Sequence, residues 1–140
     1  MDYGKIYQNN KEVNLVANSV VSENIHIPIE NLFKYSTDET PIGIWHNGKT
    51  IYRKVIPISS YPGGSVEKQY NVSSSMDECV NIYGIGKHTG NSYHIPLNFH
   101  NKDISETYSS ICYVRQNTGQ ISLKTTWPFN GYVVVEYTKN

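Results

Sequence analysis

This chain of 140 residues has no excess of charge of either sign, only two cysteines and no long hydrophobic run. Its twelve Lys and Arg residues balance twelve Asp and Glu residues, so no basic excess is available for a phosphate backbone and we expect no nucleic acid partner. No apolar run approaches the roughly 20 residues of a membrane-spanning helix. The first residues also lack the charged and apolar regions of a signal peptide. We therefore expect synthesis in a cytoplasm and no membrane insertion.

The two cysteines, Cys79 and Cys112, lie in apolar, strand-like stretches and do not form a C-x-x-C motif. Two small buried side chains are the expected outcome, and a bridge between strands is the alternative. The five histidines match none of the spacings that bind zinc or other metals. We therefore expect neither a metal nor another cofactor.

Short apolar stretches separated by turn residues follow one another along most of the chain. We expect strands at residues 52–58, 66–72, 79–87, 92–97, 110–115, 120–125 and 132–137. A helix fits only as a single turn, at residues 33–35 or 74–78. This pattern predicts an all-β fold, an antiparallel β-sandwich or jelly-roll-like domain, over residues 35–140. The last strand is apolar enough to lie in the middle of a sheet.

Residues 1–34 form a different kind of segment. Short alternating apolar pieces, such as Val13 with Leu15 and Ile25 with Ile27, are separated by polar residues. Pro28 would leave a central sheet ladder without one of its donors. We predict an extended N-terminal arm, used for attachment or oligomerisation.

Two hairpins are expected from local turn chemistry. Asn47 and Gly48 separate two alternating runs and predict a tight type I′ turn, in which both residues have positive φ. Trp45 is expected to be a buried anchor of this hairpin, with Tyr52 across from it. In the second hairpin, residues 116–119 connect the strands and Gly119 is suited to the left-handed position.

Alternation predicts that every second side chain of the second hairpin faces the core, but it does not decide which of the two sets does so. Either Ile111 and Tyr113 or Cys112 and Val114 point inward on the first strand. In the strand at residues 79–87, Gly84 and Gly86 indicate a bulge or a close backbone neighbour.

Aromatic residues beside turns are the candidates for ligand binding. Trp127 and Phe129 fall in an expected loop, residues 125–131, where they would be presented to a partner. Packing of this loop onto the sheet is the alternative. Tyr61 precedes a Pro-Gly-Gly turn, and Tyr93 and His94 follow a Gly-Asn turn, so these three are further candidates. No catalytic residues are expected, because the carboxylates lie in polar turn segments.

The residues from Gly43 to Lys54 follow the motif G-x-W-x-x-G-K-x-x-Y-R-K. This motif resembles a hairpin in a β domain that closes the C-terminal end of tail, baseplate and head fibres of tailed bacteriophages. The chain's ending, Tyr137-Thr138-Lys139-Asn140, is similar to the endings of that group. The resemblance covers residues 35–140.

The resemblance implies a non-enzymatic virion protein at the tip of a fibre, on the surface of the virion, that binds a bacterial surface saccharide. It also implies a homotrimer and contacts of the arm with other virion proteins. Two alternatives stay open: a capsid or tail decoration protein whose arm adds strands to a neighbour, and a carbohydrate-active enzyme. In a trimer, three copies of His26 on the axis are a possible metal site.

Overall fold

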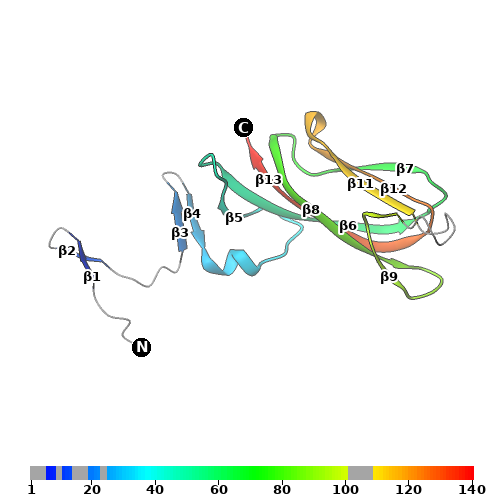
Figure 1. Cartoon of the computed structure of the whole chain (residues 1–140), viewed down its shortest axis with the longest axis horizontal. Helices are drawn as coiled ribbons and strands as arrows, with labels where there is room; N and C mark the ends of the chain where they lie inside the picture. Colours follow the sequence, from blue (N-terminus) through cyan, green and yellow to red (C-terminus); the bar gives the residue numbers. More distant parts are fainter. Residues whose placement is uncertain (1–5, 9–10, 14–18, 23–24, 101–108) are drawn as a thin grey trace.

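The computed structural model shows a chain built almost entirely of strands (Figure 1). It describes residues 6–8, 11–13, 19–22, 25–100 and 109–140. The strands are β1 (Ile6–Gln8), β2 (Lys11–Val13), β3 (Ser19–Ser22), β4 (Ile25–Pro28), β5 (Thr40–Ile44), β6 (Thr50–Tyr61), β7 (Glu67–Asn71), β8 (Met76–His88), β9 (His94–Pro96), β10 (Phe99–His100), β11 (Ser109–Arg115), β12 (Gln120–Thr125) and β13 (Phe129–Lys139). Two short 3-10 helices are η1 (Ile29–Phe33) and η2 (Gln116–Thr118). Within these described ranges no helix is long and apolar enough to cross a bilayer.

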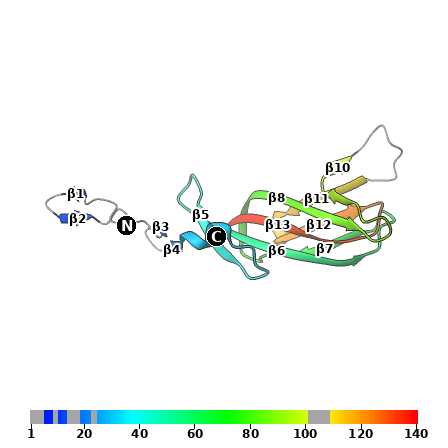
Figure 2. The same ribbon diagram turned by 90° about the horizontal axis from the view of Figure 1, so that it is seen from below.

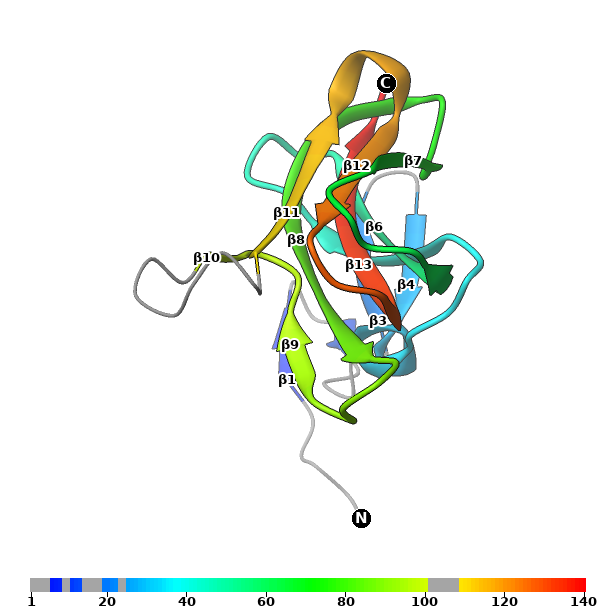
Figure 3. The ribbon, with the colours of Figure 1, turned by 90° about the vertical axis from the view of Figure 1, so that its right-hand side faces the viewer.

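Two antiparallel sheets form the two layers of a sandwich (Figures 1 and 3). The larger sheet has the strand order β5-β6-β13-β8-β9 and the smaller one β10-β11-β12-β7. The all-β sandwich predicted from the sequence is thereby confirmed, with β13 in the middle of the larger sheet as expected. β1 pairs with β2 and β3 with β4, in two hairpins that lie outside the sandwich. The C-terminus lies at the end of the sandwich that these hairpins and η1 adjoin (Figure 2).

The core lies between the two sheets because both supply alternating apolar side chains. Val133, Val135 and Tyr137 of β13 point inward, and Ile121 and Leu123 of β12 meet them from the smaller sheet. The core side chains are Ile56, Ile58, Tyr61, Val72, Met76, Leu97, Cys112, Ile121, Leu123, Trp127, Phe129, Val133, Val135 and Tyr137. Burial of this apolar surface is the main stabilising contribution to the fold.

An aromatic cluster fills one end of the core. The rings of Tyr61 and Phe129 are stacked with centroids 5.0 Å apart, and Trp127 lies 4.9 Å from Phe129. A Cβ atom on Gly86 would lie 2.6 Å from side-chain carbons of both Trp127 and Phe129. Glycine at this position therefore makes room for the rings. The close backbone neighbour predicted for this strand is found at Gly84, where a Cβ atom would lie 2.5 Å from Tyr132 O.

The first hairpin forms where it was predicted, but with a different turn. The Gly48 N–H donates to Trp45 O at 2.8 Å, and the Trp45 N–H donates to Lys49 O at 2.8 Å. Within the loop at residues 46–48 only Gly48 has a positive φ, at 83°. The type I′ prediction is wrong, because this loop has three residues and needs a single left-handed position. Asn47 instead accepts the Lys49 N–H through its side chain, at 3.0 Å.

Trp45 is not the buried anchor that the sequence predicts. It is half-buried, and its indole Nε1 donates to Glu78 Oε2 at 3.0 Å. Tyr52 also does not lie across from Trp45. The reason is that Ile44 pairs with Thr50, which places Trp45 opposite Lys49. Tyr52 pairs with Pro41 on one side and with Tyr137 on the other.

The second hairpin agrees with its prediction and decides which set of side chains faces the core. Gly119 is left-handed with φ 62°. Cys112 is buried and Val114 packs against the core, whereas Ile111 and Tyr113 are exposed. The single helical turn expected at residues 74–78 is wrong, since β8 begins at Met76. The turn expected at residues 33–35 lies earlier, in η1.

Candidate ligand-binding site

Three of the five aromatic and histidine candidates are core residues. Trp127 has 2% of its surface exposed, and Phe129 and Tyr61 are equally buried. The expectation that Trp127 and Phe129 are presented to a partner is wrong, and packing onto the sheet is what the structure shows. The physical reason is that β13 begins at Phe129, so the expected loop is short and turns its rings inward.

Tyr93 and His94 are exposed, as predicted. They lie where β8 turns into β9, and the Tyr93 carbonyl accepts the His88 N–H at 2.8 Å. His94 pairs with Lys87 at the edge of the larger sheet. These two residues do not share a surface with Trp127, Phe129 or Tyr61, because those three side chains are buried in the core.

A groove lined by tyrosines lies on the outer face of the larger sheet. Val55, Val134 and Tyr83 are neighbours in register on β6, β13 and β8. Tyr132 precedes Val134 on the same face of β13, and Tyr35 covers them from outside the sheet. Together they enclose a cavity of about 420 Å³. The full lining of this tyrosine groove is Tyr35, Ser36, Thr37, Val55, Tyr83, Tyr132 and Val134.

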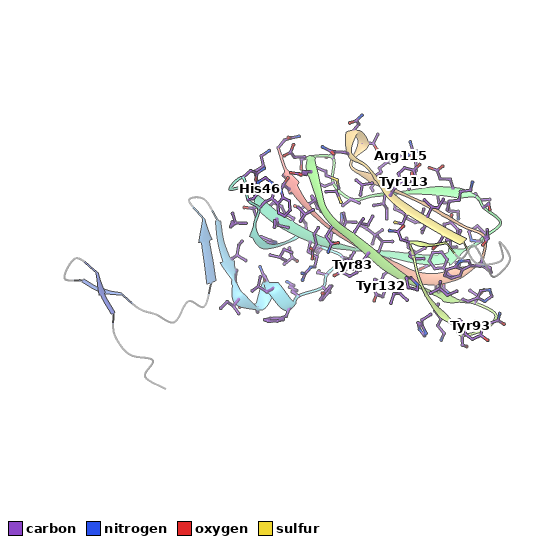
Figure 4. The ribbon with its side chains drawn as sticks, in the orientation of Figure 1. His46, Tyr83, Tyr93, Tyr113, Arg115 and Tyr132 are labelled. Carbon is purple, nitrogen blue, oxygen red and sulfur yellow. The ribbon has the colours of Figure 1, made fainter. Side chains whose placement is uncertain are left out.

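The three tyrosines of the groove remain open to solvent. Their exposed fractions are 58% for Tyr35, 38% for Tyr83 and 42% for Tyr132. Val134, by contrast, is buried although it points away from the core. The groove therefore has aromatic walls and an aliphatic floor (Figure 4).

One wall comes from the linker, which we define as residues 34–39 between η1 and β5. The Val55 N–H donates to Ser36 O at 2.8 Å, so the linker runs beside β6 as an additional backbone partner. The hydroxyl of Tyr83 donates to the hydroxyl of Tyr35 at 3.3 Å. The groove is thus a composite of sheet and linker.

Arg53 fastens this linker to the sheet. Its Nη1 donates to Leu32 O at 2.9 Å and to Lys34 O at 3.4 Å, and its guanidinium lies 4.5 Å from the centre of the Tyr35 ring. Its Nε donates to Glu136 Oε1 at 2.8 Å. Both charged side chains are largely buried. Arg53 therefore determines where Tyr35 stands.

The lining of the groove carries no formal charge. Burial, followed by the contact with Tyr35, raises the pKa of Tyr83 to about 12, so its hydroxyl stays protonated at neutral pH. Arg53, whose guanidinium contacts the Tyr35 ring, is paired with Glu136. The groove can offer hydrogen bonds from neutral hydroxyls and contact with aromatic faces.

The tyrosine groove was not predicted from the sequence. Tyr83 and Tyr132 lie in predicted strands, where tyrosine is common on any half-exposed face. Their positions relative to Val134 follow from alternation once the register is known. Tyr35 carried no functional signal, because the sequence predicted only a single helical turn at residues 33–35.

A second polar cluster lies on the outer face of the smaller sheet. Arg115 Nη2 donates to Glu67 Oε1 at 2.8 Å, and the Tyr113 hydroxyl donates to the same oxygen at 2.9 Å (Figure 4). The hydrogen bonds from Arg115, Ser122 and Tyr113 lower the pKa of Glu67 to about 2. Each of these polar groups has a hydrogen-bond partner within the cluster, and these bonds connect β7, β11 and β12.

No group of three or more His, Cys, Asp or Glu residues that could hold a metal exists in the part of the chain that the structure describes. The His26 side chain lies outside that part. Cys79 and Cys112 are free thiols, and burial raises the pKa of Cys112 to about 12. The bridge left open by the sequence is not formed.

Known proteins add nothing to this description of the site. No family model, no curated protein and no solved structure matches this chain. The resemblance to phage fibre domains remains a prediction that rests on the residues of the hairpin motif and the chain's ending.

Glu39 links the linker to β13, and we expect its contribution to stability to depend on pH. Burial disfavours its charge, but hydrogen bonds from Lys139 and Tyr137 outweigh this and lower its pKa. A lowered pKa stabilises the fold above the ordinary value of 4.5, and the effect disappears as pH falls through the folded value. Glu39→Gln should therefore cost about 1 kcal/mol at neutral pH.

Urea unfolding at neutral pH and near pH 3 measures this difference between Glu39→Gln and the unsubstituted protein, which should be smaller at the lower pH. Asp38→Asn is the control, since it removes the same charge from the neighbouring exposed position. A loss that is equally large at both pH values would contradict the role given to the Glu39 carboxylate.

Proposed function

We propose that this chain is a non-enzymatic bacteriophage virion protein that binds a saccharide on the host surface through the tyrosine groove. The observation that carries the proposal is the groove itself, with Tyr35, Tyr83 and Tyr132 exposed around a cavity of about 420 Å³. A volume of this size falls within the roughly 300–1,000 Å³ of small-molecule sites.

The chemistry of the groove suits a sugar. A pyranose ring has an apolar C–H face and a rim of hydroxyls. The tyrosine rings supply flat apolar surface for the first, and their hydroxyls can donate to or accept from the second. Holding Tyr35 in place before binding reduces the entropy lost on association.

The hairpin motif from Gly43 to Lys54 supports a place at a fibre tip on the virion surface. In this proposal the sandwich, residues 35–140, is the tip and the arm, residues 1–34, contacts other virion proteins in a homotrimer. The hairpins β1–β2 and β3–β4 lie outside the sandwich, which leaves them accessible to such partners (Figure 1). Light scattering of the purified chain gives the solution mass that tests the trimer.

Tyr132→Ala tests the role of the groove. We expect about a tenfold weaker binding to host-type cells and to their purified wall polysaccharide, because a central aromatic contact is lost. Tyr113→Ala is the matched control: Tyr113 is 40% exposed, against 42% for Tyr132, but it stands on the outer face of the smaller sheet. Equal binding by all three proteins, in a pull-down with matched concentrations, would reject the groove as the receptor site.

A capsid or tail decoration protein is the second candidate, and one observation favours it. Ile29, Leu32 and Phe33 of η1 expose apolar side chains at the base of the arm. Exposed apolar groups that lie together indicate a protein contact. A monomer that binds virions but ignores cells, with binding lost in Phe33→Ser and kept in Tyr132→Ala, would favour this function.

A further inference from the structure

The polar and apolar groups of the tyrosine groove are distributed unevenly. The two valines of the floor, Val55 and Val134, lie side by side on β6 and β13, and Val134 is buried. Hydroxyl groups are supplied by the more exposed residues Tyr35, Tyr83 and Thr37. A ligand that fills the groove must therefore place an apolar group at the bottom and polar groups at the rim.

The absence of charged side chains from the lining is a second restriction on the ligand. None of the seven lining residues is ionisable near neutral pH, and Arg53 behind Tyr35 already forms its ion pair with Glu136 at 2.8 Å. A carboxylate, sulfate or ammonium group on the ligand would lose its hydration here without gaining a partner. The lining is complementary to an uncharged ligand.

We infer that the groove binds an uncharged hexose that carries a methyl group, in an acetamido or a 6-deoxy substituent, with the methyl group against Val55, the accessible valine of the floor. This inference rests on the proposed function and names the substrate class of the same site. Acetamido and 6-deoxy sugars share the chemistry that the floor selects, and the experiment below separates them.

The floor of the groove disfavours a hydroxyl group of the ligand. A hydroxyl placed against Val55 loses its water and finds no hydrogen-bond partner, which is unfavourable. A methyl group in the same place gains from leaving water and keeps the ring hydroxyls at the rim, near the tyrosines. Discrimination of about tenfold is typical of one such group in an apolar pocket.

The test measures binding of two pairs of sugars to the full chain. Binding is monitored by NMR titration of the protein's amide signals. N-acetylglucosamine is compared with glucose, and 6-deoxygalactose with galactose. We expect at least one methyl-bearing sugar to bind about tenfold more tightly than its parent. In saturation-transfer spectra its methyl protons should receive the strongest transfer. The pair that shows the preference identifies the substituent.

A variant of the floor supplies the control. Val55→Thr exchanges a methyl group for a hydroxyl at a half-buried strand position and should abolish the tenfold preference. Val66→Thr makes the same exchange at an exposed position outside the groove and should leave it unchanged.

Parent and methyl-bearing sugars that bind equally, or no binding by any of the four, would overturn the inference. Such a result leaves the proposed function standing if Tyr132→Ala still weakens attachment to cells. When attachment is also unaffected by Tyr132→Ala, the proposed function fails with it. The two failures are therefore distinguishable.

Discussion

Arg53→Met is expected to lower the free energy of unfolding by about 3 kcal/mol, because it leaves the Glu136 carboxylate largely buried without its partner. The substitution also removes both hydrogen bonds to the carbonyls of Leu32 and Lys34 and the contact with the Tyr35 ring. The free energy needed to separate the linker from β6 should then be lower than the free energy of unfolding of the sheet. Urea unfolding gives the first effect, and amide hydrogen exchange at residues 34–39 gives the second.

The double variant Arg53→Met with Glu136→Leu separates the two effects. Removing both charges should restore much of the stability, since no uncompensated charge remains, while the linker stays loose. Arg115→Met is the matched control. Its ion pair with Glu67 is far more exposed than that of Arg53, so its loss should cost much less. Equal losses for Arg53→Met and Arg115→Met would show that Arg53 is not a buried clamp.

Trp127→Ala is expected to cost about 3–5 kcal/mol of stability, the range for a large aromatic removed from a core. Its ring lies between Phe129 and the stacked His88, at centroid distances of 4.9 Å and 6.0 Å, and nothing nearby can fill the space. Trp127→Phe should cost much less. It keeps most of the apolar contact and removes the indole Nε1, which is buried without a hydrogen-bond partner among the described residues.

Thermal and urea unfolding of the two variants measure this difference, and saccharide binding is recorded beside them. Because Trp127 is buried in the core and does not line the groove, the folded fraction of Trp127→Ala should still bind through the groove. A variant with unchanged stability and no binding would restore the interpretation of Trp127 as a presented ligand contact.

The fold was largely predictable because its sequence signals are local. Alternation over residues 110–115 and 120–125, with a left-handed Gly119 between them, specifies a hairpin without reference to the rest of the chain. The turn at Gly48 was predicted with the wrong geometry. Asn-Gly favours a two-residue loop, but the pairing of Ile44 with Thr50 leaves more residues in the connection.

The site was not predictable, since its parts meet only through register. Tyr35, Tyr83 and Tyr132 come from three separate segments, and nothing local distinguishes them from the other tyrosines. Trp127 gave the opposite error. A Trp-Pro-Phe stretch between two strands reads as an exposed loop, whereas room made by Gly86 in the neighbouring strand lets the ring enter the core.

The linker that carries Tyr35 also joins the arm to the sandwich. Tension applied to the arm therefore reaches the sheet through the hydrogen bond from Asn31 to Pro41 O of β5 and through the Arg53 contacts, and the Arg53 contacts transmit it to one wall of the groove. Thermodynamic linkage works in both directions. Under the proposed function, immobilising the arm should keep this wall in place and raise the affinity of the groove for its ligand, and a bound ligand should resist movement of the arm.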